Sequence, residues 1–594
     1  MEKNTIWAIV LSTLVIVVFS FIQINSIQQV PVTENVTAES TAEIVNTPVV
    51  VAAEQASEID ATSLPDVKEE EIVITTDLIS VTLTNKGGDV ISYKLLEHKD
   101  GDNYVNMVDN VSETNRAFSI ALGNENNPII NELFYVEKKD ANTVRFSRPY
   151  TLKNADGSVS NFTLIKQYTF MPGEYVFMLD VYIKGSDSMT GLNINNTAYT
   201  LRSSPQIGPY YDKKRDRYEN RTFQSFTGEK SKTQTLSDGQ TKDYTDSFTW
   251  TGVTGKYFAL LVSPVSPVSS SSIISKAVYS TKEEITDYAN AQNMLVRVPV
   301  LQNSVQDTYY IYAGPRTESS LKRYNNAAEN GWSIANMKFD YSLQSSGILS
   351  WLEIALKWIM GIVYKLIPNY GVSILIMTLL LRLALFPLTK KSSVSTIKMQ
   401  EIQPKMKEIQ EKYKDNKEKL NMEMAKFYKE AGYNPLMGCL PLLIQFPIII
   451  AMFNLFNNYF EFRGAMFIPG WIPDLSVGDS VYTLGFNLPL LGNQIRILPL
   501  IYLASQFIQG MITNAANPGA QGKSMKITFY IMYVVFFFMF YNAPAGLLLY
   551  WTFSNILMMG QQVIINNMMK KKRAELEAAK ANERPVFIPN KKKK

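Results

Sequence analysis

Arg382 has the surroundings that most suggest a chemical role. It lies inside the apolar stretch Gly371 to Leu388, and Thr378 precedes it by one helical turn on the same face. A charge at the centre of a membrane-crossing helix costs roughly 3 kcal/mol on insertion scales. At ~1.5 Å per residue, Arg382 is about 9 Å from the end of the stretch. Its side chain therefore either snorkels toward lipid headgroups or lies in a polar cavity.

Polar side chains also occur within the later apolar stretches. They either line one cavity together with the arginine or join neighbouring helices through hydrogen bonds, and for any single residue the second role is the better explanation. Trp551, Asn555 and Gln562 share one helical face. The predicted substrate groove comprises Arg382, Thr378, Gln445, Gln506, Tyr550, Trp551, Asn555 and Gln562.

No Asp or Glu occurs in any of the predicted spans, so the sequence offers Arg382 no intramembrane counter-ion. We hypothesise a water-filled groove, open to the cytoplasm and sealed toward the outside, in which Arg382 attracts acidic residues of a polypeptide segment about to cross. Such an attraction exceeds its bulk-water value of about 1 kcal/mol when the groove is partly dehydrated. This mechanism requires no ATP. The one string that resembles a phosphate-binding loop, Gly522-Lys-Ser524, has Asn517 where its first glycine is needed.

The chain has one cysteine, Cys439, and one histidine, His98. These counts exclude an intramolecular disulfide and a thiolate metal cluster, and they remove most hydrolase, metalloenzyme and redox chemistry. We predict no catalytic residues, no metal, no cofactor and no enzymatic activity. A secondary transporter would show internal repeats and paired intramembrane acids, and an intramembrane protease two aspartates or a Ser/His pair, and the spans have none of these.

Hydropathy predicts an α-helical polytopic membrane protein with six spans. The first is an N-terminal signal-anchor in residues 1–27, favoured over a cleaved signal peptide because no small-residue cleavage site follows it. With Lys3 placed in the cytoplasm, the lysine-rich loops and the lysine-rich tail all lie on the cytoplasmic side, as the positive-inside rule requires, so both termini are cytoplasmic. The C-terminal spans, within residues 369–569, are Gly371–Leu388, Gly438–Asn458, Ile497–Thr513, Ile527–Tyr541 and Leu547–Asn566.

Three segments flank these spans. Residues 345–368 form an amphipathic helix with one polar stripe, typical of a helix lying along a membrane surface. Residues 389–433 have apolar positions spaced four, three, four on either side of Asp415-Asn416, which predicts a cytoplasmic helical hairpin. Its lysine-rich exterior provides solubility and orientation, or else a cap over the groove or a ribosome contact. The basic tail, residues 570–594, is suited to anionic lipid or ribosomal RNA, without sequence specificity.

The segment outside the membrane is of a different class. Residues 28–71 are too polar to bury a core and are predicted to be a flexible linker. In residues 72–330, clusters of β-forming residues alternate with Gly, Asn, Asp and Ser turns, which predicts an all-β sandwich domain. Sugar binding and a structural or docking role are both open for such a domain. We favour the second, because no acid and histidine pair marks a catalytic pocket.

Motifs along nearly the whole chain resemble the YidC/Oxa1/Alb3 family of membrane protein insertases. Those of the outer domain are Asn85–Gly88, Trp250–Phe258 and Gly314–Arg316. Those of the C-terminal third are Thr378–Arg382, Lys398–Pro404, Asn434–Pro447, Trp471–Ser476, and Gly546–Asn555 with Gln561-Gln562.

The resemblance implies a protein of the bacterial inner membrane that inserts nascent membrane proteins and acts as their chaperone, alone or with the Sec translocon (SecYEG and SecDF). It also implies a five-span insertase core and a periplasmic β-supersandwich of the Gram-negative type, similar to sugar-epimerase folds but without residues for that activity. Arg382 matches the groove arginine, Thr378 and Trp551 match substrate-contacting positions, and Gln445 matches a groove-lining one. The family usually has tyrosine at position 551, so no hydroxyl-dependent role is implied there.

Overall fold

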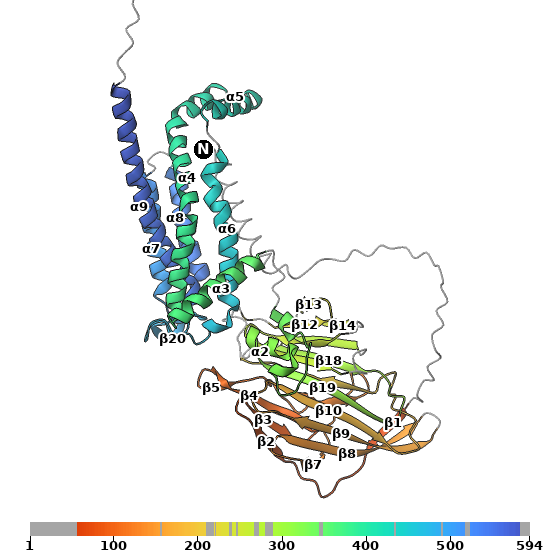
Figure 1. Cartoon of the computed structure of the whole chain (residues 1–594). Coiled ribbons are helices and arrows are strands. Elements are labelled where there is room, and N and C mark those ends of the chain that lie inside the picture. The colour runs from red at the N-terminus through yellow and green to blue at the C-terminus, as the bar shows by residue number, and fades with distance from the viewer. Residues whose placement is uncertain are drawn as a thin grey trace, which may run out of the picture. The chain divides into compact units, whose positions relative to one another are not determined.

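The computed structural model describes residues 56–582, apart from 155–156, 210–218, 220, 237–239, 245–247, 266–271, 280–288, 344–348, 433–434, 489–490 and 517–522. The predicted signal-anchor in 1–27, the linker up to residue 55 and the last part of the basic tail lie outside the described residues. The chain divides into two compact units, one before and one after the segment around Gln344 and Ser345. Figure 1 shows a unit of strands and a unit of helices, and each is described by itself.

The β-unit contains nineteen described strands, and every pairing between them is antiparallel. They are β1 Ala56–Ala61, β2 Glu71–Thr75, β3 Ile79–Thr84, β4 Asp89–Asp100, β5 Asn103–Asn106, β6 Ile120–Leu122, β7 Tyr135–Lys138, β8 Thr143–Asn154, β9 Val159–Thr169, β10 Val176–Gly185, β11 Tyr199–Arg202, β12 Thr222–Phe226, β13 Ser231–Gln234, β14 Thr241–Tyr244, β15 Trp250–Thr254, β16 Phe258–Pro264, β17 Ser272–Tyr279, β18 Ala289–Arg297 and β19 Ser304–Pro315.

These strands form three sheets. The largest has ten strands in the order β1-β8-β9-β10-β19-β16-β15-β12-β13, with β7 pairing beside β8. The second has the order β14-β17-β18-β11-β6, and the third the order β2-β3-β4-β5. Strand β8 alternates buried and half-exposed residues, as expected where one face of a sheet is covered, whereas every residue of β16 is buried. The prediction of a mostly β periplasmic domain is therefore confirmed at the level of its sheets.

The predicted linker extends too far toward the C-terminus. Strand β1 lies within residues 28–71 and pairs with β8 from Ala56, opposite Asn154, to Ala61, opposite Tyr150. The prediction was wrong for these residues because it relied on the absence of an apolar pattern. An edge strand is held by backbone hydrogen bonds along one side and needs few apolar side chains.

The β-unit also continues beyond the predicted boundary at residue 330. After β19 come α2 Glu318–Lys322 and three 3₁₀ turns, η3 Arg323–Asn325, η4 Ala327–Glu329 and η5 Phe339–Leu343. Tyr324 and Phe339 are fully buried, and their ring centroids lie 5.9 and 5.8 Å from that of Tyr312 in β19. These aromatic contacts attach the helical turns to the large sheet, which a strand pattern alone does not reveal.

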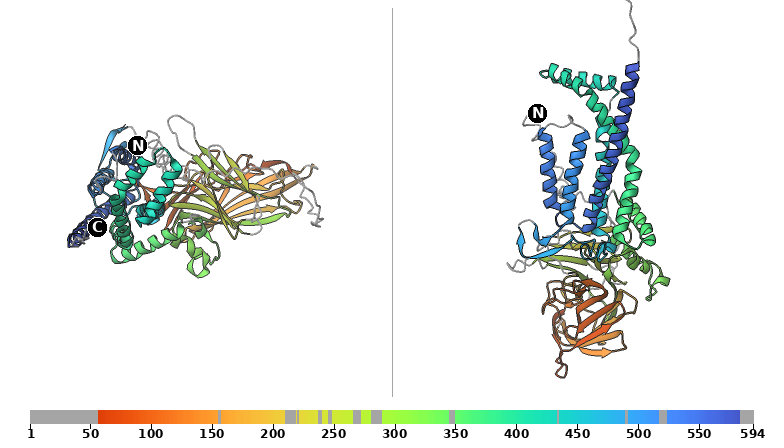
Figure 2. Two further views of the ribbon diagram at one scale, coloured as in Figure 1. Left: turned by 90° about the horizontal axis from the view of Figure 1, so that it is seen from above. Right: turned by 90° about the vertical axis from the view of Figure 1, so that its left-hand side faces the viewer.

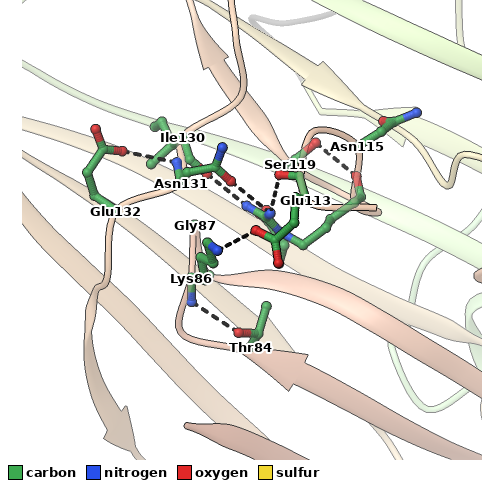
Figure 3. A network of polar contacts seen from close by, with 12 residues as sticks. Thr84, Lys86, Gly87, Glu113, Asn115, Ser119, Ile130, Asn131 and Glu132 are labelled. Atoms are coloured by element: carbon green, nitrogen blue, oxygen red, sulfur yellow. Dashed lines mark hydrogen bonds and ion pairs between the residues drawn. The ribbon is translucent and has the colours of Figure 1, made fainter. Parts of the chain in front are cut away.

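A buried ionic network joins the small sheet to the large one. Asp89, at the start of β4, accepts hydrogen bonds from Arg116 Nε at 2.9 Å and from Lys166 Nζ of β9 at 2.5 Å. Arg116 also donates to the backbone oxygens of Glu113 and Ile130 and to the Asn131 side chain, part of the polar network that Figure 3 draws. All three charged residues are almost completely buried, so each depends on the others for solvation.

The helical unit consists of α3 Ser350–Leu366, α4 Tyr370–Lys412, α5 Lys417–Glu430, α6 Pro435–Asn458, α7 Leu498–Ala516, α8 Lys523–Phe540 and α9 Ala545–Asn582, with η6 Phe460–Phe462 and the strand pair β20 Tyr482–Leu488 and β21 Gly492–Ile495 between α6 and α7. Figure 2 shows α4, α6, α7, α8 and α9 running side by side, with α5 beyond one end of them and β20 at the other. We call the β20 end the outer end and the α5 end the inner end.

All five predicted C-terminal spans coincide with helices. Among the described residues, only the stretch Tyr370–Lys390 of α4 is both long and apolar enough to cross a membrane by length and composition. The apolar parts of the next helices are shorter, at Pro447–Asn458, Leu498–Ile512 and Phe529–Phe540. Helical segments were therefore predicted correctly, while the number of spans is not established by the helices themselves.

The predicted first C-terminal span and the first arm of the predicted hairpin 389–433 belong to one continuous helix. Helix α4 continues through Pro387 and Pro404 to Lys412, so the first arm of the hairpin extends the span. The predicted break at Asp415-Asn416 is confirmed, since α5 starts at Lys417 with the Asn416 side chain accepting from Lys419 N–H at 3.0 Å. Likewise α9 runs on to Asn582, which makes the start of the basic tail helical. In both places the sequence changes from apolar to polar, and this alone does not end a helix.

Helix α3 corresponds to the predicted amphipathic helix, within residues 345–368. The start of its polar stripe is turned inward, because Glu353 is only 7% exposed and accepts a hydrogen bond from Asn454 of α6 at 3.0 Å. The side facing away from the bundle is apolar, with Trp351 and Trp358 each about two-thirds exposed, at 67% and 68%. Tryptophan is typical of the membrane–water boundary.

Candidate functional site

Arg382 lies between helices α4 and α9. Its Nε donates to the hydroxyl of Ser554 at 2.9 Å, and Nη2 reaches the same oxygen. The Gln561 side chain donates to the backbone oxygen of Arg382 at 3.0 Å. Arg382 is half-buried and Ser554 is buried. The guanidinium is thus held against a neighbouring helix, and we call this contact the α4–α9 seam.

The local sequence explains this position. Helix α4 starts at Tyr370, where the Asn369 side chain accepts from Val372 N–H at 3.0 Å, and no polar residue other than Ser373, Thr378 and Arg382 occurs before Thr389. On α9, Ser554 and Gln561 are seven residues apart and therefore on one face. That face and α4 meet along the length that contains Arg382.

A second group of polar contacts lies on the other side of α9, and we call it the α7–α9 seam. Asn555 Nδ2 donates to Ser505 Oγ at 3.0 Å, and that hydroxyl donates to the Tyr502 backbone oxygen at 2.6 Å. Gln506 donates to the Tyr502 hydroxyl at 2.7 Å. Gln509 lies 2.8 Å from the sulfur of Met558. This seam contains amides and hydroxyls that bond to each other, as expected of interhelical packing contacts.

Trp551 lies at the edge of the α7–α9 seam. Its ring centroid is 5.6 Å from that of Tyr502 in α7 and 4.6 Å from that of Phe540, the last residue of α8. The Phe540 contact is edge to face, the arrangement that aromatic quadrupoles favour. Trp551 therefore connects α9 to both α7 and α8.

The remaining predicted groove residues have separate surroundings. Thr378 is fully buried, and its hydroxyl donates to the Ile374 backbone oxygen at 2.6 Å. Tyr550 is 3% exposed, with its ring 5.9 Å from that of Phe456. Gln562 is half-buried and donates to Asn566 on its own helix at 2.9 Å. Gln445 lies in α6, and its side chain is outside the described residues. Arg382 thus lies in the α4–α9 seam, Gln506 and Asn555 lie in the α7–α9 seam with Trp551 at its edge, and Thr378, Tyr550 and Gln562 lie in neither seam.

Sequence reasoning missed Ser554 and Gln561, the residues that contact Arg382. It grouped Trp551, Asn555 and Gln562 on one face of the last span, and that grouping falls one position away from Ser554 and Gln561. A signal was present in the spacing of Ser554 and Gln561. Both faces are polar, however, and the sequence of one helix does not tell which of them meets α4.

In the part of the chain that the structure describes, no ion pair involves Arg382, so this residue has no acidic partner there. Among the described residues, the Ser554 hydroxyl is the group that solvates the half-buried guanidinium. A hydroxyl offsets much less of the cost of a partly buried charge than a carboxylate does.

Among the described side chains of α4 and α9, packing differs between the two ends of the bundle. The buried apolar cluster collects outer-end residues from several helices, among them Ile374, Met377, Met452, Phe456 and Leu548. Beyond Thr378, no residue of α4 up to Lys390 is buried. Beyond Asn555, Ile565 is the one buried residue among the described side chains of α9. Arg382 lies just past the end of the closely packed region.

The outer end is also closed by polar contacts of the segment between α6 and α7. The Asp479 carboxylate is buried and accepts from the backbone N–H groups of Ile497 and Leu498, both at 2.9 Å, and from Trp471 Nε1 at 2.9 Å. A carboxylate at a helix N-terminus bonds free N–H groups and complements the helix dipole. Burial lowers the pKa of the adjacent Arg496 guanidinium, whose Nη1 donates to the Asp479 backbone oxygen at 2.8 Å.

Comparison with known proteins bears directly on this arrangement. A family model described as "YidC periplasmic domain" matches residues 71–358, and one described as "60Kd inner membrane protein" matches residues 362–572. The membrane protein insertase YidC of Treponema denticola is 48% identical over 573 residues, which cover 94% of this chain and 97% of the relative. The chain belongs to the YidC family of membrane protein insertases.

Other YidC proteins are also similar. The membrane protein insertase YidC of Treponema pallidum is 40% identical over 523 residues, covering 82% of this chain and 83% of that relative. A solved structure described as an active YidC insertase with its first transmembrane domain resolved is 18% identical, with a TM-score of 0.33, and covers 86% of this chain and 94% of that one. The predicted family is confirmed. This YidC-family chain is an inner-membrane protein with a helical insertase region and a periplasmic domain made mostly of β-sheets.

Proposed function

We propose that this insertase receives the membrane-crossing segments and short extracytoplasmic tails of nascent membrane proteins in a polar groove at the inner half of its helical unit, and that Arg382 is the groove's binding charge. An acidic residue in the client's tail pairs with the guanidinium while the adjoining apolar segment passes along the helices into lipid. The protein acts in this way as insertase and chaperone, alone or with the Sec translocon.

The observation that carries this proposal is the state of Arg382. The guanidinium is half-buried between two helices, it bonds to a neutral hydroxyl, and no described carboxylate pairs with it. An arginine kept only for stability would be expected to have an acidic partner. A charge left with one hydroxyl remains available to an acidic group brought by a client.

The position of Arg382 along α4 supports a groove that opens toward the cytoplasm. Outward of it, Thr378 and Met377 are fully buried, and the Asp479 contacts close the far end. Inward of it, Leu383 is 59% exposed. A client tail would therefore meet the arginine at the deepest point that it reaches before the packed outer region.

The α7–α9 seam has a different role in this proposal. The Asn555 amide donates to the Ser505 hydroxyl, so these two side chains have fewer hydrogen-bonding groups available to a client than Arg382 has. Trp551 contacts α8 at its outer end, where that helix meets α9. We assign the seam to holding α7, α8 and α9 together, and we assign Trp551 at its edge and Tyr550 beside it on α9 to the aromatic wall of the groove.

We further propose six spans, with both termini in the cytoplasm and the β-unit, a β-supersandwich, in the periplasm. The lysine-rich parts of the sequence, Lys390–Lys429, Lys523 with Lys526, and the C-terminal tail, then share one side. In the helical unit, α5 and the C-terminal part of α9 extend beyond the same end of the bundle, opposite β20 (Figure 1).

The short predicted spans are suited to a locally thinned bilayer. Helix α8 has 18 residues, which at ~1.5 Å per residue give about 27 Å against a hydrocarbon core of roughly 30 Å. A short span is accommodated by thinning of the surrounding lipid. Thinning lowers the barrier for a client tail, because the polar residues have less hydrocarbon to cross.

The inner end carries the surfaces proposed for partners. The lysine-rich arm of α4 and α5 faces the cytoplasm, where a ribosome presents nascent chains. The basic tail binds anionic lipid or ribosomal RNA through charge and recognises no specific nucleic-acid sequence. SecYEG and SecDF are assigned as partners through family membership.

The decisive experiment removes the arginine at position 382 and then restores it at the adjacent position 554. We expect Arg382→Ala to reduce insertion of a small client with an acidic translocated tail by about tenfold, equivalent to 1.4 kcal/mol, while a client with a neutral tail is affected less. Because Arg382 and Ser554 are in contact, the exchange Arg382→Ser with Ser554→Arg keeps a guanidinium in the seam. Proteoliposomes that contain each purified variant provide the assay.

The proposal predicts that the exchanged pair restores insertion of the acidic client. Equal insertion by Arg382→Ala and the native protein would reject a binding role for the charge. A thermal unfolding measurement on each variant checks that the protein remains folded.

A further inference from the structure

The segment between α6 and α7 contains an amphipathic strand pair that the proposed insertion route does not use. Strands β20 and β21 are antiparallel, with Tyr482 opposite Ile495 and Thr483 opposite Gln494. Because opposed residues share a face, Tyr482 and Ile495 lie together, and we call the exposed apolar side chains of Tyr482, Phe486 and Ile495 the apolar face. Thr483 and Gln494 lie opposite each other on the other face, and the register of the two strands shifts between Thr483 and Leu488. We call this strand pair the ribbon.

The apolar face of the ribbon is uncovered in the helical unit. Tyr482 and Phe486 are each 63% exposed and Ile495 is 36% exposed. No charged residue occurs from Ser480 to Ile495. An isolated two-stranded pair is marginally stable in water, and a row of exposed aromatic side chains adds to the cost. An apolar environment must therefore cover this face in the working protein.

Arg496, the charged residue nearest to the ribbon, points away from it and attaches the ribbon to the helical bundle. Arg496 follows Ile495 directly, and its guanidinium donates to Asn542 Oδ1 at 3.2 Å and to the Asp479 backbone oxygen at 2.8 Å. Tyr541 joins the two parts, since its hydroxyl donates to the Gln494 oxygen at 3.0 Å and accepts from Arg496 N–H at 3.1 Å. The ribbon is thereby held at the outer ends of α7 and α8, where Figure 2 shows it.

The exposed apolar surface continues from the ribbon onto α7. Ile497, between the ribbon and the helix, is 38% exposed, and Leu500 in the first turn of α7 is 48% exposed. Arg496 lies between the ribbon and Ile497, but its guanidinium is hydrogen-bonded to Asn542 and to the Asp479 backbone, so the exposed apolar side chains on either side of it are placed to meet the same lipid.

We propose that the apolar face of the ribbon lies in the outer leaflet of the membrane, at the boundary between headgroups and acyl chains, beside α7 and α8. This inference rests on the proposed function for the assignment of α7 and α8 as spans. Aromatic side chains favour that boundary. The free strand edges, which would be unsatisfied in hydrocarbon, bond to headgroups and water there.

Lipid is favoured over a protein partner by the composition of the face. Protein interfaces have a polar rim and are enriched in arginine, whereas the ribbon has no charged side chain. A second copy of the chain would have to present a matching apolar surface, and the exposed side of α3 with Trp351 and Trp358 is occupied by the membrane boundary in the same arrangement.

Fluorescence quenching tests the placement. Cys439 is the only cysteine, so Cys439→Ser provides a background for single labelling sites with an environment-sensitive fluorophore. Phe486→Cys reports on the apolar face, and Thr483→Cys is the matched control at a polar position of the same strand. Ile508→Cys, at a 45% exposed position of α7, reports on a span. The full-length protein is placed in lipid nanodiscs, which leave both membrane faces accessible to solutes.

The inference predicts that iodide in the buffer loses access to the label at Phe486→Cys, while lipids with a nitroxide near the headgroup quench it. The label at Thr483→Cys remains accessible to iodide. Equal iodide quenching at the two positions would show the ribbon in water and overturn the inference. Protection from iodide without quenching by nitroxide lipid would show a protein partner or a second copy and would overturn it as well.

The label at Ile508→Cys separates the two proposals. Quenching there by lipids with a nitroxide near the chain end confirms α7 as a span, whatever the ribbon does. Absence of that quenching contradicts the six-span arrangement and leaves the readout at Phe486→Cys to decide on the ribbon by itself.

Discussion

The guanidinium of Arg382 in α4 donates through Nε to the hydroxyl of Ser554 in α9 at 2.9 Å, joining positions 172 residues apart in the chain. The contact orients the charge between two helices and leaves its remaining hydrogen-bonding capacity for another group.

Removal of the Ser554 hydroxyl should weaken insertion of an acidic client. Ser554→Ala removes the oxygen that both Nε and Nη2 of Arg382 contact, where one hydrogen bond to a charged group is worth about 1.5–3 kcal/mol, and it leaves Arg382 without a fixed orientation. We expect insertion of an acidic client to fall about tenfold. Ser505→Ala is the matched control, because Ser505 is also buried and bonds across a helix pair. If both variants lose stability equally and neither loses insertion, the α4–α9 seam is only a packing contact.

The attachment of α3 should depend on pH. Burial raises the pKa of Glu353, against the effects of its Asn454 hydrogen bond and of Lys357. A carboxyl with a raised pKa in the folded protein binds its proton more tightly than in the unfolded chain, whose pKa is about 4.3. Its stabilising contribution is therefore fully present below that value and is lost as the pH rises through the folded-state pKa.

The measurement for α3 is the unfolding temperature as a function of pH, in native protein and in Glu353→Gln. The difference between the two curves isolates this carboxyl from the other titrating groups. We expect the unfolding temperature of the native protein to fall relative to that of the Glu353→Gln variant as the pH increases above about 4.3. Parallel curves across the whole range would contradict a titrating role for Glu353.

The buried Asp479 carboxylate should be essential to the outer end of the bundle. Asp479→Ala removes three hydrogen bonds, those from Trp471, Ile497 and Leu498, and exposes the start of α7. At about 1 kcal/mol or more for each bond we expect a loss of about 3 kcal/mol, seen as a lower unfolding temperature in detergent. Asp474→Ala, which loses one bond from Ser476 N–H, is the control and should lose about a third as much. A loss no greater for Asp479→Ala than for Asp474→Ala would show that the outer end is held by apolar packing alone.

In the β-unit, Asp89 should stabilise the junction of the small and the large sheet. Asp89→Ala leaves Lys166 and Arg116 buried without their carboxylate, which typically costs 3–5 kcal/mol. Amide hydrogen exchange of the full-length protein should increase in β4 and β9. Glu113→Ala serves as comparison, since Glu113 pairs with Lys86 at the surface, with 79% of its side chain exposed. Such pairs contribute at most about 1 kcal/mol. Unchanged exchange in Asp89→Ala would mean that the network adds nothing to the junction.

The positions of the helices were predictable because each apolar stretch is long and bounded by polar residues. All five C-terminal stretches correspond to helices, and Arg382 stands out in the first of them. The contact partner of Arg382 was not predictable. Residues 554 and 555 are both polar and about 100° apart on the helix, and only the packing of α4 and α7 against α9 decides that Ser554 faces Arg382 while Asn555 faces Ser505.

Two other features could not be predicted from the pattern of apolar residues. Strand β1 is held by its backbone against β8 and carries almost no apolar signal. Helix α4 continues past Pro387 because a proline removes one hydrogen bond and bends a helix without ending it when the flanking residues remain helical. A sequence pattern reports which side chains avoid water, so both features fall outside its reach.

The uneven packing of the helical unit determines where its stability resides. Among the described side chains of the helices, the largest buried apolar cluster lies near Ile374, Phe456 and Leu548, so the described apolar packing is concentrated at the outer end. We expect separation of the inner halves of α4 and α9 to require less free energy, so that local opening there leaves the fold intact. In the proposed function, this opening would let the helices change spacing for clients of different bulk, while the packed outer halves return them to the same positions after each client leaves.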